Sequence, residues 1–177
     1  MVDYFQIFNI PRKFFVDLSD LEKKFYEQSR LYHPDRFSTL GAEAKQASLE
    51  KMSELNQAFT TLKNPEFRCS YLLKLEGVVS DTKKSQIPLE LTEAWFELQE
   101  LILEDPRKAQ EKSMSFEKEI QKHFSKIKTE INSLEKEYDT GTLQKIALEK
   151  IALLLDTQSY LKSLERDFTR KMKHEVS

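Results

Sequence analysis

The residues best suited to chemistry in this sequence are His33, Pro34 and Asp35, which follow one another directly. An imidazole and a carboxylate two residues apart present a hydrogen-bonding ring and a charged acceptor in one place, and the proline between them restricts the backbone. Proline also disfavours a helical conformation at His33, so a helix that runs up to Leu31 and Tyr32 must stop there. We therefore expect the three residues at an exposed tip between two helices, where they contact a partner.

The helices that position this tip follow from the spacing of apolar residues. Leucines and aromatic residues recur at helical intervals over about 18–32, a helix for which Asp17 or Ser19 is a suitable cap. A second stripe runs over 48–62 and is broken by Pro65. The two amphipathic helices on either side of the tip should pair antiparallel.

The second half of the chain has a different pattern. Serine, threonine and lysine replace the apolar periodicity after the first unit, which predicts a connection. Beyond it, Pro88, Pro106 and Gly141 delimit three amphipathic stretches, and three such helices with short turns bury their stripes most simply as an antiparallel bundle. The predicted organisation is all-α, with a helical hairpin unit at 1–77, a linker at 78–86 and a three-helix bundle at 87–177.

Composition and charge exclude several function classes. With a formal net charge of −2, the chain as a whole has no basic footprint of a nucleic-acid-binding protein, which leaves a local basic patch open. The single Cys69 excludes an internal disulfide and a cysteine zinc cluster, and no apolar run approaches the ~20 residues of a membrane span. We expect a cytoplasmic protein with no cofactor, no metal site, and no nucleic-acid or membrane partner.

A second candidate surface lies on the helix predicted over 88–104. If Leu91 and Leu98 face the bundle core, Phe96 and Leu103, seven residues apart, share another face that carboxylates surround. The apolar centre of such a patch supplies affinity and the charges supply orientation. The alternative is that Phe96 packs against a neighbouring helix or the N-terminal unit.

Taken together, these motifs resemble a known family. The tip and its flanking helices resemble the J-domain of co-chaperones that act on DnaK-type ATPases. The wider match is to the HscB family, of the bacterial type without an N-terminal cysteine zinc module. The stretches that carry it are Asp3-Tyr4-Phe5, Arg30 to Phe37, Asn56 to Phe59, Leu62 to Pro65, Arg68 and Tyr71-Leu72-Leu73.

The resemblance implies a co-chaperone, not an enzyme. Such a protein stimulates the ATPase of a DnaK-type chaperone, HscA in bacteria, and delivers to it an IscU-type scaffold protein, which promotes iron–sulfur cluster assembly. For contact with the ATPase chaperone it implies His33, Pro34 and Asp35, with basic residues at Lys24, Arg30 and Arg36. For contact with the scaffold it implies Thr92, Glu93, Phe96, Glu97, Glu100 and Leu103.

Three other interpretations of the sequence are open. A J-protein of the same fold would serve another client, and a purely structural helical adaptor would use neither surface in this way. A small hydrolase would use His33 and Asp35 as an acid–base pair, but no nucleophile, glycine-rich loop or second histidine supports it.

Overall fold

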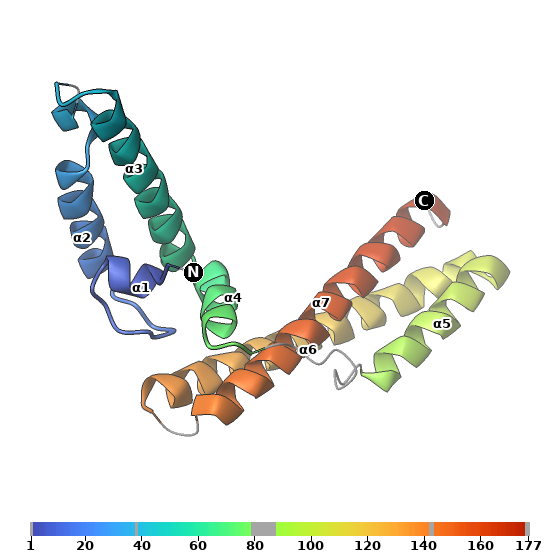
Figure 1. Ribbon diagram of the computed structural model, residues 1–177. Coiled ribbons are helices and arrows are strands. Elements are labelled where there is room, and N and C mark those ends of the chain that lie inside the picture. The colour runs from blue at the N-terminus through green and yellow to red at the C-terminus, as the bar shows by residue number, and fades with distance from the viewer. Residues whose placement is uncertain (1, 38, 79–87, 142–143, 176–177) are drawn as a thin grey trace. The chain divides into compact units, whose positions relative to one another are not determined.

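The computed structural model describes residues 2–37, 39–78, 88–141 and 144–175, and within these ranges all regular structure is helical (Figure 1). The all-α class predicted from the sequence is confirmed. None of the described helices is both long and apolar enough to cross a membrane. In chain order the elements are α1 (Tyr4–Ile7), α2 (Leu18–Leu31), the 3₁₀ turn η1 (Pro34–Phe37), α3 (Ala42–Lys63), α4 (Pro65–Leu75), α5 (Leu89–Glu104), α6 (Pro106–Asp139) and α7 (Gln144–Glu175).

The chain divides into two compact units. The first comprises residues 1–78 together with 138–142, and the second comprises 79–137 together with 143–177. Apart from Val78, the predicted linker at 78–86 lies outside the described residues.

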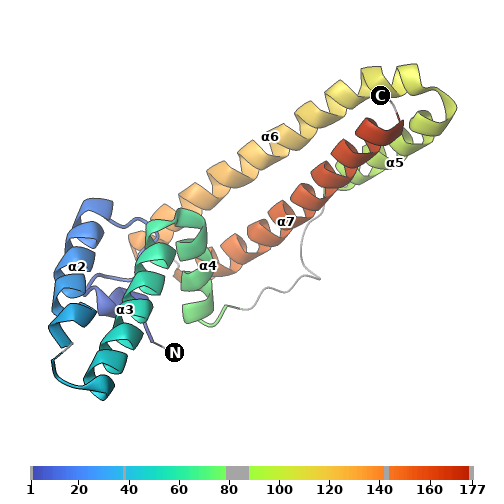
Figure 2. The same ribbon diagram turned by 90° about the horizontal axis from the view of Figure 1, so that it is seen from above.

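In the first unit, α2 and α3 lie side by side as a hairpin (Figures 1 and 2). Of the two candidate caps, Asp17 is the one that caps α2, because its carboxylate accepts hydrogen bonds from the backbone N–H groups of Ser19 and Asp20. The rings of Phe25 and Phe59 stack between the two helices with centroids 4.2 Å apart. The apolar stripes of both helices are thus used to hold the hairpin together.

The base of the hairpin is closed by α1 and α4. The Tyr71 hydroxyl accepts a hydrogen bond from the Tyr4 N–H and donates one to the Val2 carbonyl, both at 3.0 Å, while the Tyr4 and Tyr71 rings stack. Burial raises the pKa of the Tyr71 hydroxyl. Arg68 is buried, and its guanidinium donates to the carbonyls of Phe14 and Leu62, so that one side chain joins three segments of the unit.

Helix α4 ends in a glycine with a left-handed backbone conformation, as helices commonly do. Gly77 has a positive φ of 69°, its N–H donates to the Lys74 carbonyl at 3.2 Å, and the Val78 N–H donates to the Leu73 carbonyl at 2.9 Å. These two bonds form a Schellman motif. Val78, predicted as the first linker residue, therefore completes the terminus of α4.

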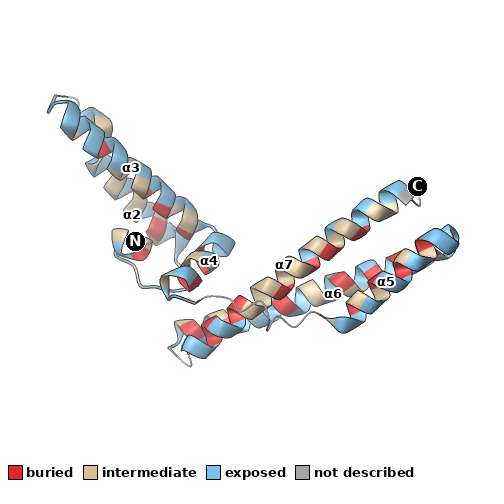
Figure 3. Ribbon diagram, turned by 45° about the vertical axis from the view of Figure 1, so that its right-hand side comes forward, coloured by how far each residue is buried: buried red, intermediate tan, exposed pale blue. Residues whose placement is uncertain are grey.

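The second unit is a bundle of α5, α6 and α7, whose buried residues recur along one side of each helix (Figure 3). On α5 the structure buries Trp95 and Ile102, while Ala94 and Leu101 lie at the edge of the core. The Trp95 ring stacks on Phe116 of α6, with centroids 5.7 Å apart, and meets Phe168 of α7 edge-on. Each such buried side chain stabilises the bundle by about 1.5–3 kcal/mol.

Candidate partner-binding sites

The tip of the first unit presents His33, Pro34 and Asp35 between α2 and α3. Helix α2 ends at Leu31, and Pro34 begins the 3₁₀ turn η1, because its φ suits a first-turn position where no N–H is needed. The side chain of Asp35 is 90% exposed and that of His33 is 54% exposed. The two groups that could contact a partner thus both face solvent.

The tip is anchored to both neighbouring helices. The Arg36 N–H donates to the His33 carbonyl at 3.0 Å, and the Arg36 guanidinium donates to the Arg30 carbonyl at the end of α2 at 3.1 Å. From α3, the buried Ser48 hydroxyl donates to the Tyr32 carbonyl at 2.6 Å. The two side-chain bonds satisfy carbonyls at the C-terminal end of α2 and join the tip to α2 and α3.

His33 and Asp35 also contact each other. The Asp35 N–H lies 3.3 Å from His33 Nδ1, an arrangement that suits a neutral imidazole with its proton on Nε2. In the protonated imidazole, Nδ1 can instead donate to Asp35 Oδ2, which lies 3.5 Å away. In both states the contact orients the ring and leaves Nε2–H as a donor.

The basic residues predicted beside the tip differ in how free their side chains are to contact a partner. Arg30 is exposed on α2, whereas the Lys24 ammonium lies 2.9 Å from the Asp20 carboxylate and donates to the Asn9 carbonyl at 3.2 Å. Arg36 is partly used in holding the tip. The patterns did not single out Tyr26, which is 61% exposed and stands one turn before Arg30 on the same face of α2. In the sequence, the four-residue spacing from Tyr26 to Arg30 indicates that Tyr26 shares the exposed face of Arg30 and lies off the buried stripe.

The second surface is an apolar stripe on α5, here called the Phe96 face. It consists of Leu89, Phe96 and Leu103, which stand seven residues apart and are 67%, 61% and 79% exposed. At 61% exposure Phe96 is not packed into the core of the bundle, so it does not pack against a neighbouring helix of its own unit. Leu89 was not predicted, although the same interval of seven residues pointed to it.

The polar residues around the Phe96 face are not equivalent. Glu93 and Glu100 are exposed, whereas Glu97 forms an ion pair with Lys112 of α6. Thr92 is turned toward the bundle, where its hydroxyl lies 3.2 Å from the Tyr160 hydroxyl of α7 and 3.3 Å from the Pro88 carbonyl. The structure therefore gathers Glu93 and Glu100 with Phe96, and it gives Thr92 a contact inside the bundle.

Comparison with known proteins yields two sequence matches, each over less than half of the chain. The DnaJ domain family matches residues 3–71. A curated relative, the co-chaperone protein HscB of Proteus mirabilis (strain HI4320), is 38% identical over 77 residues. That stretch covers 44% of this chain and 44% of the relative, so the sequence match spans less than half the length of either protein.

Solved structures match the fold over nearly the whole chain. The crystal structure of human co-chaperone protein HscB matches with a TM-score of 0.61 and 23% identity, covering 97% of this chain and 82% of that one. The chaperone HscB from Vibrio cholerae matches with a TM-score of 0.56 and 20% identity, covering 99% of this chain and all of that one. At these identities the likeness establishes the arrangement of helices in each unit.

Proposed function

We propose that this chain is a co-chaperone, because the DnaJ domain family matches residues 3–71 and because the chain resembles HscB co-chaperones in part of its sequence and in its fold. It stimulates the ATPase of a DnaK-type chaperone of the HscA kind and delivers to it an IscU-type scaffold protein, so that iron–sulfur clusters are assembled and transferred. The first unit engages the ATPase and the bundle holds the scaffold. The chain itself catalyses no reaction.

The observation that carries the proposal is the geometry of the tip. A carboxylate that is 90% exposed stands beside an oriented imidazole, on a turn that one backbone hydrogen bond closes and two further hydrogen bonds hold to α2 and α3. Such a carboxylate is suited to accept charge-assisted hydrogen bonds from an arginine on a partner, and the rigid turn limits the entropy lost on binding. Arg30 and Tyr26 extend this contact along α2.

The Phe96 face supports the second half of the proposal. Three large apolar side chains exposed in one line are typical of a protein-binding surface, and Glu93 and Glu100 beside them favour a partner with basic residues. A face of this kind binds a folded protein surface better than a small molecule, because it is long and not concave.

The decisive experiment measures the ATPase rate of an HscA-type chaperone with this protein, with and without an IscU-type scaffold. Wild-type protein should raise the rate, and scaffold should raise it further. His33→Gln should abolish stimulation while helicity and thermal unfolding stay nearly unchanged, because the side chain is exposed and makes no core contact.

The same assay separates the rival interpretations. Equal stimulation by His33→Gln would refute the role of the tip. Stimulation that scaffold does not increase would favour a J-protein for another client, and the absence of any stimulation would favour a structural adaptor.

A further inference from the structure

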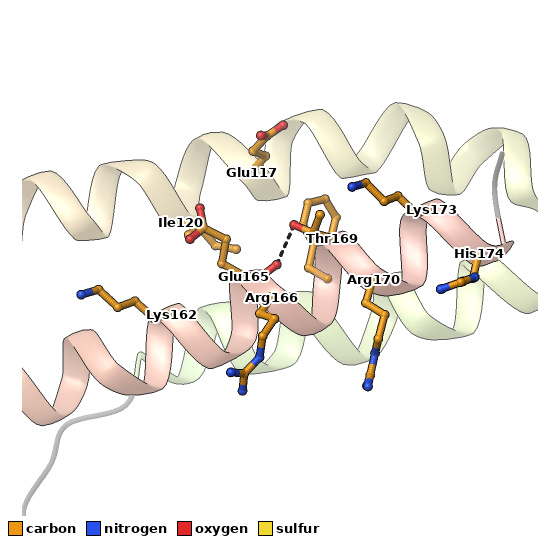
Figure 4. A pocket seen from close by; sticks show the side chains of 10 residues that line it. Glu117, Ile120, Lys162, Glu165, Arg166, Thr169, Arg170, Lys173 and His174 are labelled. Carbon is orange, nitrogen blue, oxygen red and sulfur yellow. Dashed lines mark hydrogen bonds between the residues drawn. The ribbon is translucent and has the colours of Figure 1, made fainter.

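A groove between α6 and α7 shares no lining residue with the two sites described above. Its volume is about 490 Å³, and all its lining residues belong to these two helices (Figure 4). Ile120 and Phe168, which are almost completely buried, are its apolar residues. The remaining lining residues are Glu117, Lys162, Glu165, Arg166, Thr169, Arg170, Lys173 and His174.

The groove carries a surplus of positive charge. Four lysine and arginine side chains line it against two carboxylates, which leaves two net positive charges even with His174 neutral. Moreover, the Glu165 carboxylate already accepts a hydrogen bond from the Gln121 amide at 2.8 Å. The chain as a whole is slightly acidic, so this surplus is local.

The basic groups of the groove are only weakly used within the bundle. Arg166 donates to the Ser163 hydroxyl at 3.1 Å, and Arg170 lies 3.4 Å from Asp167, both on the exposed surface of α7. Exposed contacts of this kind contribute little to stability, so exchanging them for bonds to a partner costs little. Figure 4 shows Arg166 and Arg170 extending from the same side of α7.

The spread of the charges decides what kind of ligand fits. Lys162 and Lys173 are eleven residues apart on one helix, a distance of about 16 Å at 1.5 Å per residue. A single phosphate would contact only some of the basic side chains between Lys162 and Lys173. An extended peptide of about five residues spans it, and alternate side chains of such a peptide point to the same side.

We infer that the α6–α7 groove binds an acidic peptide segment of a partner protein. The carboxylates of the peptide pair with the basic row of α7, which consists of Lys162, Arg166, Arg170 and Lys173. Each of the two arginines offers paired N–H groups to a carboxylate. Ile120 and Phe168 close the floor of the groove, but they are only 1% and 7% exposed, so the charges supply the affinity. This surface is separate from the Phe96 face, whose carboxylates suit a basic partner, so the inference does not depend on the proposed co-chaperone function.

The test uses the full chain and a fluorescein-labelled eight-residue peptide of alternating glutamate and leucine, with fluorescence anisotropy as the readout. The peptide should bind in low salt, and a version with glutamine in place of glutamate should bind at least tenfold more weakly. The double variant Arg166→Ala/Arg170→Ala should also bind at least tenfold more weakly. Lys150→Ala, an exposed charge removal on the opposite side of α7, should change affinity less than twofold.

Three results would overturn the inference. Equal binding by the double variant, with unchanged thermal unfolding, would place the peptide elsewhere. Full displacement of the peptide by equimolar inorganic triphosphate would indicate a small-anion site. A dimer that forms at high protein concentration and is lost in the double variant would make a second copy of this chain the occupant, through the five glutamates of its α5.

Discussion

The tip at 33–35 and the Phe96 face differ in what holds their side chains in place. The tip occupies a single turn and depends on hydrogen bonds from the Arg36 N–H, the Arg36 guanidinium and the Ser48 hydroxyl of α3. The Phe96 face runs from Leu89 to Leu103 of α5, fourteen helical steps or about 21 Å, and depends only on the regularity of that helix.

This difference sets how each surface should respond to change. A polar contact at a fixed turn depends on distance and direction, and it fails when one group is lost. An apolar face gains affinity from buried area, and each residue removed subtracts a part of it. We therefore expect steep effects at the tip and graded effects on α5.

The largest expected effect is that of Asp35→Asn. Loss of the charge weakens the hydrogen bonds expected with the ATPase chaperone, which are worth about 1.5–3 kcal/mol when a charged group takes part. ATPase stimulation should fall at least tenfold in a steady-state assay. Asp17→Asn is the matched control, because asparagine caps α2 as well as aspartate does. A similar loss in both variants would trace the effect to folding.

On the Phe96 face, Phe96→Ala should weaken binding of an IscU-type scaffold by about 1–3 kcal/mol, measured by titration calorimetry. ATPase stimulation without scaffold should remain. Phe67→Ala, another exposed phenylalanine in the first unit, should leave scaffold affinity unchanged. Unchanged affinity in Phe96→Ala would show that the scaffold binds elsewhere.

Ser48→Ala tests whether the tip depends on its anchor. It removes the 2.6 Å bond to the Tyr32 carbonyl, which should lower the free energy of unfolding by about 1 kcal/mol and reduce ATPase stimulation only partly. Denaturant unfolding and the ATPase assay measure the two effects. Ser53→Ala, on the exposed side of α3, should change neither. Full stimulation by a destabilised Ser48→Ala would mean that the tip needs no anchor.

The smallest effect is expected from Lys112→Ala, which releases Glu97 from its ion pair. Exposed pairs contribute about 0.2–1 kcal/mol, so thermal stability should hardly change. Scaffold binding should tighten by about twofold if Glu97 takes part, since its carboxylate no longer has a competing partner. A loss of affinity would instead show that Lys112 itself contacts the scaffold.

Much of the fold follows from local patterns in the sequence. The cap at Asp17, the break before Pro65 and the left-handed Gly77 each act within a few residues of the chain, so their effect is visible in one dimension. The seven-residue interval of Phe96 and Leu103 likewise predicts a shared face without knowledge of any neighbour.

The sequence did not show in the same way which polar side chains are available to contact a partner. Lys24 and Thr92 stood in suitable positions, yet Lys24 is held by Asp20 and Asn9, and Thr92 lies beside Tyr160, sixty-eight residues away. Contacts of this range depend on how helices pack and which rotamer each side chain takes.

The sequence by itself therefore determined the cap of α2, the break of the following helix before Pro65, that His33, Pro34 and Asp35 stand at a turn, and that α5 has a second apolar face. These features depend on backbone sterics and on a period of 3.6 residues. Only the tertiary structure decided that Ser48 anchors the tip, that Glu97 is paired with Lys112, and that α6 and α7 enclose a basic groove. The reason is that packing brings together groups from distant parts of the chain. Their burial and the interactions between their charges arise only once the helices have packed.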